Sequence, residues 1–286
     1  MSEKKLRYNE IYFSPEDSEK IKDLYLSGNS TVKIGQLFGV SHKKIAKVLE
    51  EFGIPRTGVG RRKHGINECY FDEIDTPNKA YILGFFYADG SNNRNKCTVS
   101  MSLEEGDFDI LEKIRKEIES EKELEFLNYS NKHDFGYAYK NQYRLLLFSS
   151  HICDSLIRHG MVPNKSLILE FPEIRDDLLP HFIRGYFDGD GSVYQGKRKT
   201  QFTLTITSTD SFCNTLKDIV EKFVGINCHI YDASNHNGVT KVFTISGRNQ
   251  IKSFMDWIYN DADLFLQRKY DRYLNYFYNI NNSLSA

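Results

Sequence analysis

An internal repeat constrains the fold of this chain more than any other feature of its sequence. The apolar segments AYILGFFYADG (80–90) and HFIRGYFDGDG (181–191) each end in Asp-Gly, which places Asp89 and Asp190 101 residues apart (190 − 89 = 101). The length and apolar character of each segment predict a buried helix. Two copies of one pattern predict two similar halves within one monomer.

Both halves are expected to continue with the same elements. Apolar residues alternate with Thr or Ser at 97–103 and 202–207, which predicts a strand with one buried face. Amphipathic helices are expected next at 109–118 and 211–223, strands at 143–148 and 241–246, and closing helices at 151–159 and 250–259. The predicted fold class is α+β, with two pseudo-symmetric repeats at 71–170 and 171–286 after a small all-α domain.

The two Asp-Gly pairs stand at the predicted ends of the repeated helices. A glycine after the last turn can adopt the left-handed conformation of a C-cap. A carboxylate there meets the partial negative charge of the helix end, at a cost of about 0.3–1 kcal/mol. A compensating cation is therefore expected near Asp89 and Asp190.

Small residues lie one turn apart in both segments, Gly84 with Ala88 and Gly185 with Gly189. Such residues let two helices approach closely, so side-by-side packing would bring Asp89 and Asp190 to one end of the interface. Two adjacent carboxylates repel each other unless cations lie between them. Because Mg²⁺, or Mn²⁺ in its place, binds carboxylate, water and phosphate oxygens, we predict a site for metal-assisted phosphodiester hydrolysis.

The N-terminal residues 14–53 predict three short helices. Ser14, Ser30 and Ser41 stand at the expected N-caps, and Gly39 permits a turn between the second and third helices. This spacing resembles a helix-turn-helix, whose last helix enters a major groove. The exposed side of the third helix carries residue types that reach phosphates and base edges: Ser41, His42, Lys43, Lys44 and Lys47.

The charge distribution supports DNA binding by this region. The formal net charge of the chain is −1, but residues 31–66 hold eight Lys/Arg and two Asp/Glu. We therefore predict a helix-turn-helix module at 1–54 and a basic linker at 55–70 whose Arg61 and Arg62 contact DNA. The alternatives are a small three-helix cap and a plain linker, both with solvated basic side chains.

Cysteine usage and the opening residues limit the class of protein. The five cysteines are scattered and form no C-x-x-C pair, which argues against a disulfide framework and a structural zinc site and suits a reducing interior. The segment MSEKKLRYNE lacks an apolar targeting region, and no apolar run is long enough to span a membrane. A soluble, cytoplasmic protein of a phage or bacterial host is expected.

The two repeated segments carry a family resemblance. ILGFFYADG (82–90) and IRGYFDGDG (183–191) resemble the two signature motifs of LAGLIDADG homing endonucleases. The similarity extends over about 71–280 and includes GMVPNKS (160–166) and LQRKY (266–270). One departure is Tyr87, where the second motif has Asp188; that position is usually structural in the family.

The resemblance implies a fold and an activity. Two antiparallel sheets would form a saddle over a long, specific double-stranded DNA site, and a monomer would cut both strands across the minor groove. Asp89 and Asp190 would bind the metal. Lys165 and Lys269 would approach the scissile phosphates, where an ammonium group stabilises transition-state charge. Two solvated surface lysines are the alternative for the last pair.

The DNA surface is expected along the alternating strands and their loops. Short hydroxyl and basic side chains suit phosphate positioning and base readout. They are Arg94, Lys96, Thr98, Ser100 and Ser102 in the first half, and Lys197, Arg198, Lys199, Thr203, Thr205 and Thr207 in the second. An ordinary amphipathic sheet would alternate in the same way.

Two alternatives compete with an active endonuclease. The fold can persist without catalysis in a DNA-binding regulator or in a maturase that binds intron RNA, but retention of both Asp89 and Asp190 favours the enzyme. The residues from Asp188 onward also resemble a calcium loop. That site is rejected, because Val193 and Lys199 stand where the loop needs glycine and glutamate.

Overall fold

A computed structural model of the chain describes residues 13–27, 29–54, 64–129, 133–134, 137–196, 201–233 and 240–278. Contacts within the chain divide it into two compact units, Met1–Lys63 and His64–Ala286. Among the described residues, no helix is both long and apolar enough to cross a membrane.

The first unit contains the three expected helices, α1 (Pro15–Leu26), α2 (Thr31–Leu37) and α3 (His42–Glu51). Ser14 caps α1, since its hydroxyl accepts a hydrogen bond from the Asp17 amide at 3.0 Å. Gly39 has φ of +64° in the turn before α3, a conformation that favours glycine. One detail differs from expectation: the Ser41 side chain makes no capping bond.

The second unit contains two four-stranded antiparallel sheets. The first has the strand order β1-β2-β6-β3, with β1 (Gly90–Asn93), β2 (Thr98–Glu104), β6 (Gln142–Phe148) and β3 (Glu125–Leu127). The second has the order β7-β8-β10-β9, with β7 (Gly191–Gln195), β8 (Phe202–Thr209), β10 (Thr240–Ser246) and β9 (His229–Asp232). A short pair, β4 (His133–Asp134) and β5 (Tyr137–Ala138), extends the first half. The identical strand orders confirm the predicted α+β repeats.

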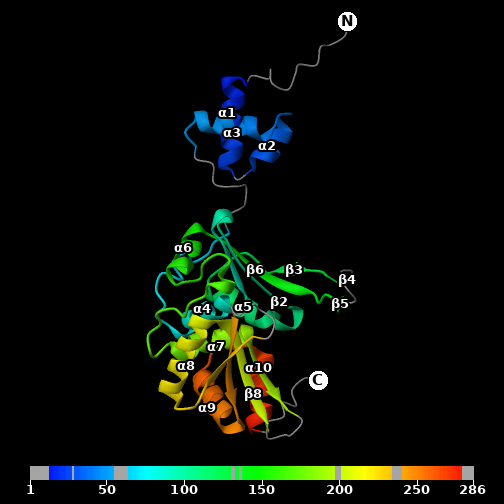
Figure 1. Cartoon of the computed structure of the whole chain (residues 1–286). Coiled ribbons are helices and arrows are strands. Elements are labelled where there is room, and N and C mark those ends of the chain that lie inside the picture. Colours follow the sequence, from blue (N-terminus) through cyan, green and yellow to red (C-terminus); the bar gives the residue numbers. More distant parts are fainter. Residues whose placement is uncertain are drawn as a thin grey trace. The chain divides into compact units, whose positions relative to one another are not determined.

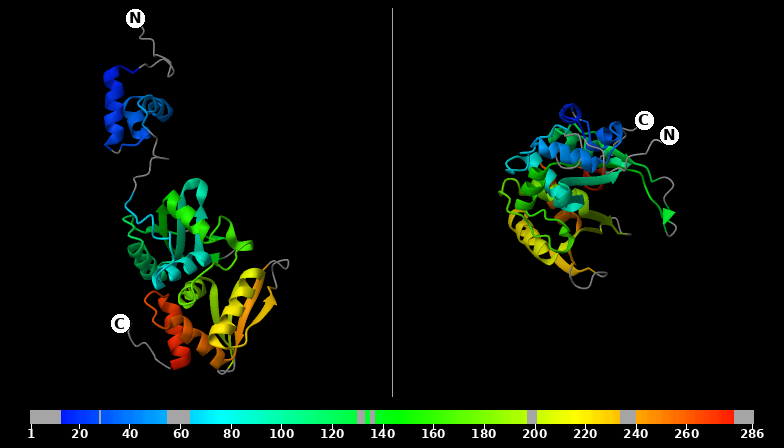
Figure 2. Two further views of the ribbon diagram at one scale, coloured as in Figure 1. Left: turned by 90° about the vertical axis from the view of Figure 1, so that its left-hand side faces the viewer. Right: turned by 90° about the horizontal axis from the view of Figure 1, so that it is seen from above.

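Two central helices, α4 (Pro77–Asp89) and α7 (Leu179–Asp190), lie side by side between the two halves (Figures 1 and 2). The remaining helices are α5 (Phe108–Glu117), α6 (Ser150–Arg158), α8 (Asp210–Val224), α9 (Arg248–Tyr259) and α10 (Gln267–Tyr278). Single 3₁₀ turns occur at η1 (Arg94–Lys96), η2 (Glu105–Asp107) and η3 (Lys165–Leu167). The sequence pattern does not predict β1, β7 or α10.

The alternating strands bury their apolar side chains as predicted. Val99 and Met101 of β2, and Leu204 and Ile206 of β8, are buried in the core of the second unit. Cys97 was expected at the start of β2, but its φ of 49° lies in the left-handed region at the end of η1, so the strand begins one residue later. The intervening Ser and Thr side chains are half-buried or exposed.

The glycines after the repeated helices do not adopt the expected left-handed conformation. Gly90 has φ −77° and ψ 151°, and Gly191 has φ −80° and ψ 153°, so both are extended and begin β1 and β7. Glycine is needed here for space. A Cβ atom on Gly90 would lie 2.5 Å from the ring of Phe86, and one on Gly191 would lie 2.1 Å from the ring of Phe187.

Candidate active site

The interface between α4 and α7 depends on the small residues of both repeats. A Cβ atom on Gly84 would lie 2.0 Å from the carbonyl oxygen of Phe182, and one on Gly185 would lie 2.0 Å from that of Tyr81. Main chain therefore touches main chain at this crossing. Any larger residue at either glycine would separate the helices, so the predicted close packing is confirmed.

The packing brings the ends of both helices together. A Cβ atom on Gly189 would lie 2.2 Å from the Ala88 Cβ atom and 3.0 Å from Oδ2 of Asp89. The carboxylate of Asp89 thus lies against the residue that precedes Asp190. Both aspartates keep an exposed outer side, while the helix interface surrounds their inner side.

Burial and mutual repulsion disfavour the charged forms of this pair. Desolvation, and next the charge of Asp190, raise the pKa of Asp89 to about 6, although Lys269 and Lys165 oppose the rise. Desolvation also raises the pKa of Asp190, again against the two lysines. Two neighbouring carboxylates whose charged forms are disfavoured in this way are typical of sites that bind cations or transfer protons.

Lys165 and Lys269 occupy equivalent positions in the two repeats. Nζ of Lys165 donates to the carbonyl oxygens of Ala88 at 3.1 Å and Gly90 at 2.7 Å. Nζ of Lys269 donates to the carbonyl oxygens of Gly189 at 3.4 Å and Gly191 at 2.5 Å, and also to Phe187 at 2.6 Å. Each ammonium group therefore satisfies the carbonyls that flank one aspartate.

These lysines are the cations that the helix ends were expected to need. A positive charge at the C-terminal end of a helix offsets the partial negative charge there. Both side chains are half-buried rather than freely solvated. Desolvation lowers the pKa of Lys165, and it lowers the pKa of Lys269 to about 8 against the pull of Asp188.

Asp188 and Tyr87 are equivalent residues with one structural task. Asp188 is fully buried and accepts hydrogen bonds from the Tyr81 hydroxyl at 3.0 Å, the Tyr259 hydroxyl at 2.9 Å and the Leu266 amide at 2.8 Å. Tyr87 donates through its hydroxyl to the carbonyl oxygen of His159. Each residue thus binds the segment that leads to the lysine of its own half.

Arg184 is a buried cation that the sequence analysis did not single out. Its guanidinium donates to the carbonyl oxygens of Leu264 at 2.8 Å and Ile258 at 2.7 Å, and to Nδ1 of His181 at 2.9 Å. The same group lies over the ring of Tyr81, 5.1 Å from its centroid. The available signal was a pair of opposite charges, Arg184 and Asp188, one turn apart in an otherwise apolar segment.

The described residues among the predicted DNA contacts of the second unit lie in η1, on β2 and on β8. Thr98, Ser100 and Ser102 of β2, and Thr203 and Thr205 of β8, are half-buried, and Thr207 is exposed. Lys96 is exposed, but the guanidinium of Arg94 is engaged by the carboxylate of Asp154. Lys197, Arg198 and Lys199 lie outside the described residues, as do Arg61 and Arg62 of the linker.

Three of the five residues on the expected DNA-binding face of α3 are exposed. His42, Lys43 and Lys47 are exposed, whereas Ser41 and Lys44 are half-buried. Ile45 and Leu49 on the opposite side are completely buried in the core of the first unit. The helix is therefore amphipathic in the predicted sense, and its role in DNA binding stays a prediction.

Parts of the chain are similar to a known family and to solved structures. Residues 177–258 match the family described as LAGLIDADG-like domain. The meganuclease I-SmaMI bound to uncleaveable DNA is similar at 13 % identity and a TM-score of 0.46, with 70 % of this chain and 88 % of that chain covered. The I-LtrWI LAGLIDADG homing endonuclease bound to target DNA is similar at 13 % identity and a TM-score of 0.44, covering 73 % and 90 %.

A third solved structure, the N-terminal LAGLIDADG domain of DUF199/WhiA, is similar at 19 % identity and a TM-score of 0.42, covering 67 % of this chain and 90 % of that chain. No curated protein sequence matches. The family match begins just before α7 and ends within α9, so it covers most of the second repeat. The predicted resemblance to LAGLIDADG proteins is confirmed for residues 177–258, which match the LAGLIDADG-like domain.

Proposed function

We propose that the chain is a divalent-metal-dependent endonuclease that hydrolyses both strands of one long DNA site. The observation that carries this proposal is the duplicated arrangement of an aspartate and a lysine at one end of the α4–α7 interface. A DNA-binding regulator or an RNA maturase of this fold needs the packing of α4 against α7. Neither needs two carboxylates held at the surface beside two half-buried lysines.

The residues present fit a cation bound by oxygen ligands. Asp89 and Asp190 offer carboxylates with an outlet to solvent, and their mutual repulsion is what a divalent cation relieves. Mg²⁺ and Mn²⁺ suit such a site, because they take one or two carboxylates and complete their shell with water and phosphate oxygens. When bound, the cation supplies Lewis acidity toward a phosphate and lowers the pKa of water.

The chain itself positions the carboxylates and the ammonium groups. Asp89 and Asp190 present their carboxylates from the ends of two helices whose main chains touch at Gly84 and Gly185. Lys165 and Lys269 place an ammonium group beside each of these ends, where it stabilises negative charge that develops on a phosphate. Because the arrangement occurs twice, one site serves each DNA strand.

A cleavage assay tests the proposal. The full-length protein is incubated with Mg²⁺ and DNA that carries the intron-less or gene-less allele of its own locus. A site-specific double-strand break supports the endonuclease. Tight DNA binding without cleavage supports a regulator, selective binding of structured intron RNA supports a maturase, and cleavage of one strand only indicates a nickase.

A further inference from the structure

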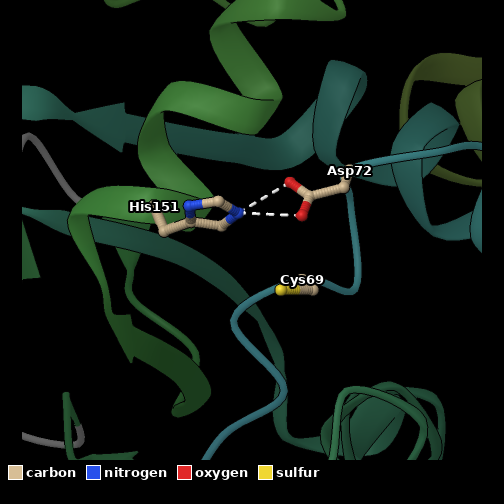
Figure 3. A group of neighbouring side chains, drawn as sticks. All are labelled: Cys69, Asp72 and His151. Atoms are coloured by element: carbon tan, nitrogen blue, oxygen red, sulfur yellow. Dashed lines mark hydrogen bonds and ion pairs between the residues drawn. The ribbon is translucent and has the colours of Figure 1, made fainter.

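Three potential metal ligands meet on the second unit, apart from the α4–α7 site. Cys69 and Asp72 belong to the segment before α4, and His151 lies in the first turn of α6. Their ligand atoms, one sulfur, one nitrogen and one oxygen, all lie within 4.8 Å of one another. In Figure 3 the His151 ring faces the carboxylate of Asp72, and the sulfur of Cys69 lies beside them.

We propose that Cys69, Asp72 and His151 bind a zinc ion that fastens the segment before α4 to α6. Thiolate sulfur, imidazole nitrogen and carboxylate oxygen are the three ligand types that zinc takes in proteins. Bonds of about 2.0–2.3 Å in a tetrahedral shell hold ligand atoms about 3.5 Å apart. Small side-chain rotations bring the ligand atoms of the three residues to this separation, since Cys69 and His151 are both exposed.

The surroundings of Asp72 resemble the outer shell of a metal site. Oδ1 accepts hydrogen bonds from the Ser155 hydroxyl at 2.7 Å and from Nη2 of Arg158 at 3.0 Å. These bonds fix the orientation of the carboxylate, as outer-shell partners do for metal ligands. Nε2 of His151 approaches both oxygens, at 2.7 and 2.9 Å, so zinc would take the place of the proton shared there.

The charge balance also suits a divalent ion. A thiolate and a carboxylate together neutralise Zn²⁺, and the neutral imidazole adds a third bond. Arg158 contacts Oδ1 only, which leaves Oδ2 for the ion. Water completes the shell. The absence of C-x-x-C pairs argues against a zinc site in the sequence, but here the pair is Cys69-x-x-Asp72, and His151 lies 79 positions after Asp72.

Cobalt substitution tests the site without any measurement of DNA cleavage. Full-length protein, stripped of metal by a chelator, is titrated with Co²⁺ and then with Zn²⁺. We expect one equivalent of Co²⁺ to give a thiolate-to-cobalt charge-transfer band that Zn²⁺ abolishes. Cys69→Ser should remove the band. Ser155→Ala should weaken binding by about 10–100-fold, and His151→Asn by more than about 100-fold.

Matched controls separate this site from the rest of the chain. Cys97→Ser, which alters a half-buried free cysteine outside the cluster, should leave the band and the affinity unchanged. The double variant Asp89→Asn/Asp190→Asn should also retain them. Circular dichroism of the metal-free variants checks that each is folded. Absence of a thiolate band from the folded wild-type protein, or equal Co²⁺ affinity in Cys69→Ser, would overturn the proposal.

Discussion

Nζ of Lys269 lies 2.5 Å from the carbonyl oxygen of Gly191, and the equivalent pair, Lys165 with Gly90, is 2.7 Å apart. The same donor therefore satisfies the same helix end in both repeats. This contact explains how a carboxylate is tolerated at the end of a helix, where the main chain is already negative. Each lysine thereby contacts the residues on both sides of one aspartate.

The aspartates are expected to be essential for cleavage. Asp89→Asn and Asp190→Asn each remove one charge from the pair at the α4–α7 interface. If the carboxylates hold the cation, each change should slow double-strand cleavage by more than about 100-fold, since the cation supplies several kcal/mol of transition-state stabilisation. Plasmid linearisation under single-turnover conditions measures the rate. Asp218→Asn, on the exposed side of α8, is the control and should cleave normally.

Replacing either lysine by methionine should affect both the rate and the stability. Lys165→Met and Lys269→Met keep the aliphatic stem but remove the donor to the helix-end carbonyls, and this loss should cost about 1–3 kcal/mol of unfolding free energy. Cleavage should slow by about 100-fold or more if the ammonium group stabilises transition-state charge. Urea denaturation and single-turnover rates separate the two effects. An unchanged rate with weaker DNA binding would make the lysines phosphate-positioning residues.

The N-terminal unit is expected to add phosphate contacts. Deletion should stop at Lys63, because the Gly65 amide donates to Glu121 at 2.7 Å and the Glu121 amide donates back to Gly65 at 2.9 Å. The remaining chain should bind DNA more weakly and with a smaller salt dependence, yet still cut at higher protein concentration. An unchanged salt slope would show that α1–α3 do not touch the target.

A milder variant checks the same face of α3. Replacing Lys43 and Lys47 by alanine in the full-length chain removes two exposed cations. If both contact phosphates, the slope of log K against log salt should fall by about 2. Lys22→Ala is the control, because its ammonium group pairs with Glu19 at 2.7 Å on a different helix.

Asp188 and Tyr87 should differ in their contribution to stability. Asp188→Ala leaves three buried donors without their acceptor, at a cost of at least about 3 kcal/mol of unfolding free energy. Tyr87→Phe removes a single hydrogen bond to His159 and should cost about 1 kcal/mol. Urea denaturation measures both. Equal losses of unfolding free energy in the two variants would mean that the three hydrogen bonds to Asp188 stabilise the fold no more than the single hydrogen bond of Tyr87.

The repeat made the helix pair and its aspartates predictable, because both follow from local pattern. The length and apolar character of the two segments indicated the helices, and Gly84 and Gly185 indicated their close packing. The extended conformation of Gly90 was not predictable in this way. It depends on the ring of Phe86 and on pairing with Met101 of the neighbouring strand. The local sequence Ala-Asp-Gly specifies neither contact.

Contacts between residues that are far apart in the sequence could not be predicted, for the same reason. Nε of Arg268 lies 3.0 Å from Oδ1 of the buried Asp107, although the two residues are 161 positions apart. The sequence around either residue does not indicate this ion pair. The cluster of Cys69, Asp72 and His151 is equally dispersed. The helix α10, which begins at Gln267 within the segment LQRKY (266–270), was not predicted either.

The last prediction concerns the pH dependence of stability and rests on His181. This side chain is only 9 % exposed, and its Nδ1 accepts a hydrogen bond from Arg184 at 2.9 Å. Desolvation, and next the charge of Arg184, lower its pKa to about 4, against the opposing pull of Asp261 and Asp177. The folded state therefore binds fewer protons than the unfolded state between pH 4 and the ordinary value of 6.5.

His181 should accordingly contribute full stability above about pH 6.5 and lose it as the pH falls toward 4, because protonation then favours the unfolded chain. The loss is at most about 3 kcal/mol, from about 1.4 kcal/mol for each pH unit. Urea denaturation of the wild-type protein and of His181→Asn at several pH values between 7.5 and 4 isolates this contribution. The variant keeps an acceptor for Arg184 but cannot titrate, so its unfolding free energy should fall less steeply over this range. Parallel curves for the two proteins would show that His181 titrates alike in the folded and unfolded states, and that Arg184 does not hold it neutral.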